Sequence, residues 1–159
     1  MVSTSTAAPR YRMTGSASMH VDAPPATVWA LISDVTRMGE WSPETYRAEW
    51  IRGSTGPAVG ARFRGWNRRP FFQRWSTRPR VRACEPEREF TFALGLPRRD
   101  FVVWRYVLDA DGSGTTVTES VTVRGWALYG LLRPRRREQQ LIDGMRVTLA
   151  RIKQAAEAA

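Results

Sequence analysis

The stretch of sequence that decides the fold is residues 19–43, MHVDAPPATVWALISDVTRMGEWSP. Its first residues alternate between apolar and polar side chains, as in a β-strand, and from Val28 to Val35 the apolar residues follow helical spacing. The pattern changes at Pro24-Pro25. Because a proline in the first helical turn gives up no hydrogen bond, Pro25 is predicted to begin a helix. A second short helix and a turn that carries Trp41 are expected to follow.

The remainder of the chain predicts a series of strands and one long helix. The alternation of side chains predicts strands over residues 45–52, 62–66, 75–84, 89–94, 101–110 and 115–123. A helical segment is expected at 126–132, where Pro134 interrupts it. An amphipathic helix is predicted at 137–156, with an apolar stripe of Leu141, Ile142, Met145, Leu149 and Ile152. This order indicates an α+β fold in which one helix lies across a curved antiparallel sheet.

The clearest hairpin joins the strands at 101–110 and 115–123 through Asp111-Gly-Ser-Gly114, a composition typical of tight turns. With Ala110 opposite Thr115, Tyr106 lies opposite Glu119, and the apolar residues of both strands share one face. A shift of one residue would destroy this agreement. The register of the hairpin is therefore predicted from the sequence.

Length and composition indicate one domain, at residues 13–159, preceded by a disordered leader at 1–12. No apolar run is long enough to cross a bilayer and no secretory signal is recognisable, so a cytoplasmic protein is expected. Cys84 is the only cysteine and His20 the only histidine, which excludes an internal disulfide and a zinc-type cluster. Neither a metal nor a cofactor is expected, and the chain is predicted to be a monomer or a homodimer.

Five short motifs together resemble those of SRPBCC proteins, in the branch named polyketide cyclase/dehydrase. They are Asp22-Ala-Pro-Pro25, Glu40-Trp-Ser-Pro43, Val59-Gly-Ala-Arg-Phe63, Gly114-Thr-Thr-Val-Thr-Glu-Ser120 and Leu141-x-x-Gly-Met145. The resemblance covers about residues 15–156. It implies the helix-grip fold, shared with pollen-allergen-like proteins and START lipid carriers, in which two short helices follow the first strand. It also implies a cavity between the concave sheet and the C-terminal helix.

The sequence supplies suitable walls for such a cavity. The expected ligand-binding residues are Trp41, Phe63, Trp104, Tyr106, Glu119, Met145 and Leu149. Pockets for small molecules are mostly apolar with a few placed polar groups, and Tyr106 and Glu119 are the candidates for those groups. The alternative is that these side chains simply fill a core.

Glu119 is the residue with the greatest chemical interest, because strand alternation places its carboxyl group among valines. Burial would raise its pKa and suit it to general acid or base catalysis. The alternative is a structural carboxylate that is bonded to Tyr106, an arginine or a loop amide. His20 falls on the opposite strand face from Met19 and Val21, so it is expected to be solvated and not catalytic.

Arginine supplies almost all of the net charge of +10, since Lys153 is the only lysine. Two basic clusters stand out, and they comprise Arg68 and Arg69 in one and Arg133, Arg135, Arg136 and Arg137 in the other. Aromatic and basic residues also alternate between Arg64 and Trp75, as in surfaces on which nucleic-acid bases stack. Such runs more often face water. Nucleic acid or another anionic surface is therefore a possible partner that the sequence does not favour.

Three hypotheses for the function follow from these features. The first is binding of a hydrophobic or aromatic small molecule, such as a lipid, a quinone or a polyketide, in the cavity. The second is an enzyme of the polyketide cyclase or dehydratase type that uses Glu119 and Tyr106 to move protons. The third is a basic interaction module for nucleic acid, the ribosome or a membrane surface. The sequence does not decide whether a reaction is catalysed.

Overall fold

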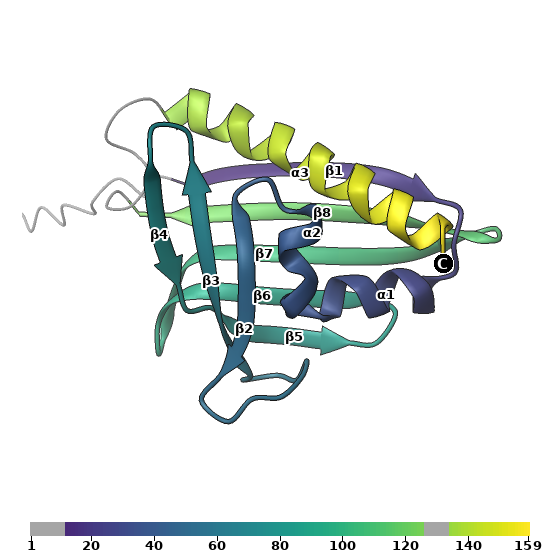
Figure 1. Ribbon diagram of the computed structural model, residues 1–159, viewed down its shortest axis with the longest axis horizontal. Helices are drawn as coiled ribbons and strands as arrows, with labels where there is room; N and C mark the ends of the chain where they lie inside the picture. The colour runs from purple at the N-terminus through teal and green to yellow at the C-terminus, as the bar shows by residue number, and fades with distance from the viewer. Residues whose placement is uncertain (1–11, 126–133) are drawn as a thin grey trace, which may run out of the picture.

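A curved antiparallel sheet of eight strands carries one long helix across its concave face in the computed structural model, which describes residues 12–125 and 134–159 (Figure 1). The predicted α+β helix-grip architecture is confirmed. The strands are β1 (Arg12–Val21), β2 (Thr45–Ile51), β3 (Arg62–Arg69), β4 (Gln73–Thr77), β5 (Arg80–Glu85), β6 (Glu89–Leu96), β7 (Arg99–Asp111) and β8 (Gly114–Arg124). The helices are α1 (Pro25–Ser33), the 3-10 turn η1 (Val35–Arg37), α2 (Met38–Trp41) and α3 (Pro134–Glu157). The strand order is β1-β8-β7-β6-β5-β3-β2, and β4 pairs with the outer part of β3.

Two strand predictions were wrong in the same part of the chain. The single strand expected at 75–84 is broken at Arg78-Pro79 into β4 and β5, because proline has no amide hydrogen to continue a ladder. The strand expected to end at Trp66 continues to Arg69, where it pairs with β4. Residues 1–11 of the expected leader, the expected helical segment at 126–132 and Arg133 lie outside the described residues, while Arg12 begins β1 and Pro134 begins α3.

Residues 19–43, the opening segment, fold as their sequence pattern predicts. Pro25 is the first residue of α1, and the carbonyl group of Pro24 accepts a hydrogen bond from the amide of Thr27 at 3.0 Å. The apolar face of α1 is buried. Asp34 caps the N-terminal end of η1, because its carboxylate accepts hydrogen bonds from the backbone amide and the hydroxyl group of Thr36.

The predicted register of the β7–β8 hairpin is confirmed at every pair. Ala110 lies opposite Thr115 and Tyr106 opposite Glu119. Val117, Glu119, Val121 and Val123 alternate as buried residues along β8, whereas the residues between them are partly exposed. The concave face of the sheet therefore receives one carboxyl group among apolar side chains.

Helix α3 buries its apolar stripe against this concave face. Leu141, Met145, Leu149 and Ile152 are all at most 6% exposed, in agreement with the predicted stripe. They contribute to two apolar clusters, one at each half of the helix. The helix therefore closes the core along its whole described length.

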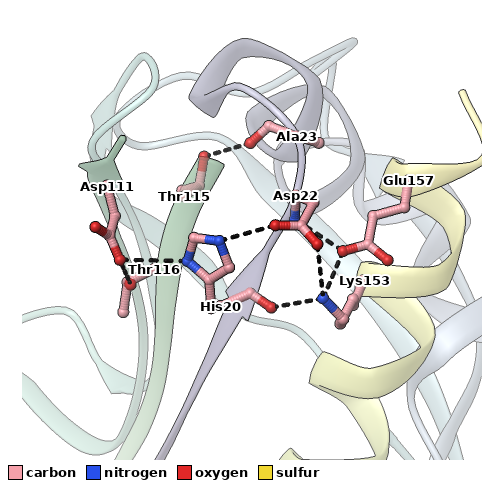
Figure 2. A network of polar contacts seen from close by, with 8 residues as sticks. All are labelled: His20, Asp22, Ala23, Asp111, Thr115, Thr116, Lys153 and Glu157. Carbon is pink, nitrogen blue, oxygen red and sulfur yellow. Dashed lines mark hydrogen bonds and ion pairs between the residues drawn. The ribbon is translucent and has the colours of Figure 1, made fainter. Parts of the chain in front are cut away.

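A polar network fixes the C-terminal end of α3 to the end of β1 (Figure 2). The ammonium group of Lys153 donates to the carbonyl oxygen of His20 at 3.0 Å, and the carboxylate of Glu157 accepts from the amide of Asp22 at 2.8 Å. The imidazole of His20 lies between the carboxylates of Asp22 and Asp111, at 3.0 and 3.3 Å. The His20 side chain is 44% exposed, as the strand alternation predicts.

Close packing in the opening segment yields a prediction about Gly39. A Cβ atom at this position would stand 2.4 Å from the backbone oxygen of Tyr46, where only glycine fits. We expect Gly39→Ala to reduce the free energy of unfolding by roughly 1–3 kcal/mol. Thermal or urea unfolding measures this change. The matched control is Gly56→Ala, where a Cβ atom meets nothing within 4 Å, and a Gly39→Ala variant as stable as this control would contradict the packing described.

Candidate functional site

A cavity of about 450 Å³ lies between the concave sheet face and the N-terminal half of α3. This volume is within the usual range for sites that hold a small molecule. Most of its wall is apolar, and the principal contributors are Phe63, Phe92, Val102, Trp104, Val121 and Met145. Gly65 of β3 is also part of the wall and, having no side chain, leaves room beside Phe63. The sheet and the helix thus enclose an apolar space that the core side chains do not fill.

The pair formed by Tyr106 and Glu119 is the buried polar feature of this wall. The phenol group of Tyr106 donates a hydrogen bond of 2.7 Å to Oε1 of Glu119. The two residues are only 6% and 3% exposed. Burial raises the pKa of Glu119 to about 8, although the hydrogen bond from Tyr106 acts in the opposite direction. Burial, followed by the neighbouring carboxyl group, raises the pKa of Tyr106 well above its ordinary value.

The proton of the neutral Glu119 acid has a defined place. Since Oε1 accepts the hydrogen bond from Tyr106, the proton belongs on Oε2. Oε2 is buried and has no hydrogen-bond partner among the described residues. Buried polar atoms nearly always have partners. The cavity wall therefore carries an unused hydrogen-bond donor at neutral pH.

The cavity wall also contains an ion pair, which joins α3 to Glu44, the residue that directly follows the segment 19–43. The guanidinium group of Arg137 forms a two-point contact with the carboxylate of Glu44, with Nη2 donating to Oε2 at 2.9 Å. The side chain of Arg137 is only 8% exposed. Asn67 lies nearby and is held by hydrogen bonds with Thr45 and Thr77.

The prediction that Arg137 belongs to a solvated basic cluster was therefore wrong. Its position in the first turns of α3 turns it inward, whereas Arg136 is exposed. Arg135 lies in α3, but its side chain is outside the described part of the chain, and so is Arg133. Arg68 is exposed and Arg69 partly exposed, and both border the cavity from β3.

The structure brings together most of the side chains expected to line the cavity. Phe63, Trp104, Tyr106, Glu119 and Met145 all form part of its wall. Trp41 and Leu149 are buried in the adjoining core at 3% and 1% exposure and are not part of the described wall.

Two residues of the site, Asn67 and Glu44, were not predicted from the sequence. Asn67 lies just beyond the predicted end of the strand at 62–66, although its spacing of two residues from Gly65 and four from Phe63 places it on the same strand face. Glu44 follows the Glu-Trp-Ser-Pro motif, and no sequence pattern indicates its pairing with a residue 93 positions away.

The described residues contain neither a metal site nor a helix that could span a membrane. Across residues 12–125 and 134–159, no three His, Cys, Asp or Glu side chains come together in a way that could hold a metal ion. None of the helices within these ranges has the length and apolar character needed to cross a membrane.

The raised pKa of Glu119 predicts how stability depends on pH. The folded protein holds this proton more tightly than the unfolded chain, so the stabilisation is complete below pH 4.5 and is lost as the pH rises from 4.5 to about 8. Relative to Glu119→Gln, which does not titrate, we expect the wild-type free energy of unfolding to fall over this window by on the order of 4 kcal/mol. Urea unfolding at pH 5, 7 and 9 measures it.

Glu89→Gln is the matched control for this experiment. Its hydrogen bond with Arg105 lowers the pKa of the Glu89 carboxyl, so this variant should follow the wild-type pH dependence above pH 5. A stability difference between wild type and Glu119→Gln that stays constant from pH 5 to 9 would show that Glu119 is ionised in the folded protein.

A family model described as polyketide cyclase / dehydrase and lipid transport matches residues 12–157. No curated protein matches the chain. The polyketide-cyclase-like protein Cgl2372 from Corynebacterium glutamicum is 32% identical, with 95% of this chain and 94% of that chain covered and a TM-score of 0.66.

Two more distant structures share the fold. The di-domain ARO/CYC BexL of the BE-7585A biosynthetic pathway is 17% identical, with 93% of this chain and 51% of that chain covered and a TM-score of 0.68. Ara h 8.0201 is 14% identical, with 94% and 100% covered and a TM-score of 0.69. From the match over residues 12–157 and the similarity to Cgl2372, we conclude that the chain belongs to the polyketide cyclase / dehydrase and lipid transport family.

Proposed function

We propose that the protein binds a hydrophobic small molecule that carries a carbonyl or other acceptor oxygen. The apolar wall of the 450 Å³ cavity suits a ring system or an acyl chain. Its family includes lipid transport in its description, which supports a ligand-binding role. The observation that carries the proposal is the Glu119–Tyr106 pair, whose second carboxyl oxygen has no partner among the described residues.

The direction of the hydrogen bonds selects the class of ligand. Below pH 8 the Glu119 carboxyl is neutral, with Tyr106 donating to Oε1 and the proton on Oε2. A ketone, quinone or enol oxygen in the cavity accepts this proton in a hydrogen bond, whereas a pure hydrocarbon leaves Oε2 unsatisfied. Since an unpaired buried polar group is costly, the site should prefer the oxygenated ligand.

A pair of probe ligands tests this preference. 2-Acetylnaphthalene and 2-ethylnaphthalene have the same ring system and differ by one carbonyl oxygen. At pH 6.5 we expect the wild-type protein to bind the ketone about five- to tenfold more tightly, as one hydrogen bond predicts. At pH 9.5, where Glu119 is ionised and has no proton to donate, the preference should disappear. Isothermal titration calorimetry or a thermal-shift titration measures both affinities.

The double variant Glu119→Met/Tyr106→Phe is the companion to this test. It replaces both partners by apolar groups of similar size, which is better tolerated than removing one. It should bind 2-ethylnaphthalene as well as the wild type does and show no preference for the ketone. Equal affinity of the wild type for the two probes at pH 6.5, or a preference retained at pH 9.5, would contradict the proposal.

The pKa of Glu119 also favours a second candidate function, a dehydratase of the polyketide cyclase type. A carboxyl group with a pKa of about 8 exchanges its proton readily near neutral pH. Its ionised form would take a proton from the carbon beside a ketone, and the acid formed would return that proton to a departing β-hydroxyl group. The bond to the hydroxyl group breaks, a carbon–carbon double bond forms, and water is released.

3-Hydroxy-1-tetralone is a probe for this reaction, because loss of water converts it to fluorescent 1-naphthol. If the protein is such an enzyme, the wild type accelerates the formation of 1-naphthol, the rate rises as the pH approaches 8, and Glu119→Gln abolishes the acceleration. If Glu119→Gln is as fast as the wild type, Glu119 is not the catalytic group. Binding of the probe without turnover leaves the ligand-binding function as the conclusion.

A further inference from the structure

The turn between β3 and β4 exposes two adjacent phenylalanines. Phe71 is 92% and Phe72 97% exposed, so neither side chain packs against the rest of the described protein. Single exposed apolar residues are common on protein surfaces, but two large aromatic side chains at one tip are not accounted for by packing.

The backbone of this turn makes the choice of residues more unusual. Phe71 and Phe72 belong to the three-residue turn 70–72 between Arg69 and Gln73, and their φ angles of +65° and +60° are in the left-handed region. Asparagine and glycine favour this conformation, whereas bulky side chains disfavour it. The two phenylalanines are therefore unfavourable here for two reasons: their apolar rings are exposed to water, and their bulk disfavours the left-handed backbone conformation.

Positive charge surrounds the tip. The hairpin, residues 62–77, contains no Asp or Glu and has the arginines Arg62, Arg64, Arg68, Arg69 and Arg74. Arg68 and Arg74 are exposed and lie directly opposite each other on β3 and β4, a like-charge pair that disfavours the hairpin. No carboxylate forms an ion pair with Arg68, Arg69 or Arg74 within the described part of the chain.

We propose that this tip, residues 68–74, is a docking surface for a membrane that contains anionic lipid. Phe71 and Phe72 would enter the boundary between headgroups and acyl chains, and Arg68, Arg69 and Arg74 would contact lipid phosphates. Such a surface would remove two costs of the free hairpin: the rings would leave water, and lipid phosphates would neutralise the arginines.

The position of the tip connects docking with the cavity. Arg68, Arg69 and Pro70 form part of the cavity wall on one side, and the first turns of α3 form part of it on the other. In Figure 1 the β3–β4 turn stands beside the N-terminal end of α3. A docked protein therefore holds its cavity at the membrane surface. The docking inference does not rest on the ligand class proposed above.

A membrane fits the tip better than a single-stranded nucleic acid does. The aromatic rings along the hairpin that could stack on bases already carry guanidinium groups, with Arg47 and Arg64 over Trp66 and Arg69 over Trp75, at 4.6 to 4.9 Å. The free rings are the two at the protruding tip, which have no polar atoms to read a base.

Flotation with 100 nm vesicles, without added ligand, tests the proposal. The vesicles contain 70% phosphatidylcholine and 30% phosphatidylglycerol, or phosphatidylcholine alone. We expect the wild type to bind the anionic vesicles and to bind less as salt increases. Phe71→Asn/Phe72→Gly should reduce the partition coefficient at least about tenfold. Its Tm should equal or exceed that of the wild type, because asparagine and glycine tolerate the positive φ angles of these two positions better than phenylalanine does. Arg68→Gln/Arg74→Gln should reduce binding by roughly fivefold per arginine.

Leu96→Asn is the matched control, because Leu96 is another exposed apolar residue, 60% exposed, at the turn between β6 and β7. It should bind the vesicles as the wild type does. Wild-type protein that ignores anionic vesicles, or a folded Phe71→Asn/Phe72→Gly variant that binds them unchanged, would overturn the proposal. The proposal would also be overturned if Phe71→Asn/Phe72→Gly reduced the binding of a 20-nucleotide RNA or the formation of a dimer but left vesicle binding unchanged. 2-Acetylnaphthalene binding in solution reports on the cavity separately and should survive Phe71→Asn/Phe72→Gly, because neither phenylalanine is part of the cavity wall.

Discussion

The structure depends on how α3 is held over the concave face of the sheet, and the opening segment holds it at three points. At the C-terminal end, Lys153 and Glu157 bind the backbone of His20 and Asp22. In the middle, Arg151 donates to the carbonyl oxygen of Trp41 at 3.3 Å. At the N-terminal end, Arg137 pairs with Glu44, the residue that directly follows this segment. An apolar stripe alone would allow the helix to slide, whereas these directional contacts fix its position and hence the dimensions of the cavity.

The fixed helix creates an apolar space, and one strand of the sheet then places an acid in it. Glu119 alternates with valines on β8, so its side chain is on the same, concave face as theirs. It could leave this face only if the register shifted by one residue, which would also move the valines to the opposite face. Tyr106, directly opposite on β7, satisfies one carboxyl oxygen, and the other has no hydrogen-bond partner among the described residues. The neutral acid at physiological pH is thus a consequence of sheet register and burial, and among the described residues no positive charge lowers its pKa.

Much of this arrangement could be predicted from the sequence, because the regular spacing of apolar residues in the strands and in the helix is compatible with only one arrangement. The hairpin register followed because only one pairing puts the apolar residues of both strands on one face, and the Tyr106–Glu119 pair came with it. The apolar stripe of α3 was equally clear. What could not be predicted depends on contacts between distant segments. Arg137 looked like part of a basic run, and only its helical position and the loop that carries Glu44 turn it into a buried ion pair. The exposure of Phe71 and Phe72 likewise required the length of the β3–β4 hairpin, which the sequence analysis had divided differently.

The central claim is that Glu119 is a neutral acid in the folded protein at neutral pH. Carbon-13 NMR of protein labelled at the glutamate carboxyl carbons measures this state directly, with Glu119→Gln identifying the resonance. The account predicts that this one signal titrates at about pH 8, whereas the exposed glutamates titrate near their ordinary value. A Glu119 signal that titrates near pH 4.5 would contradict the account, because the cavity would then hold a carboxylate with no proton to donate.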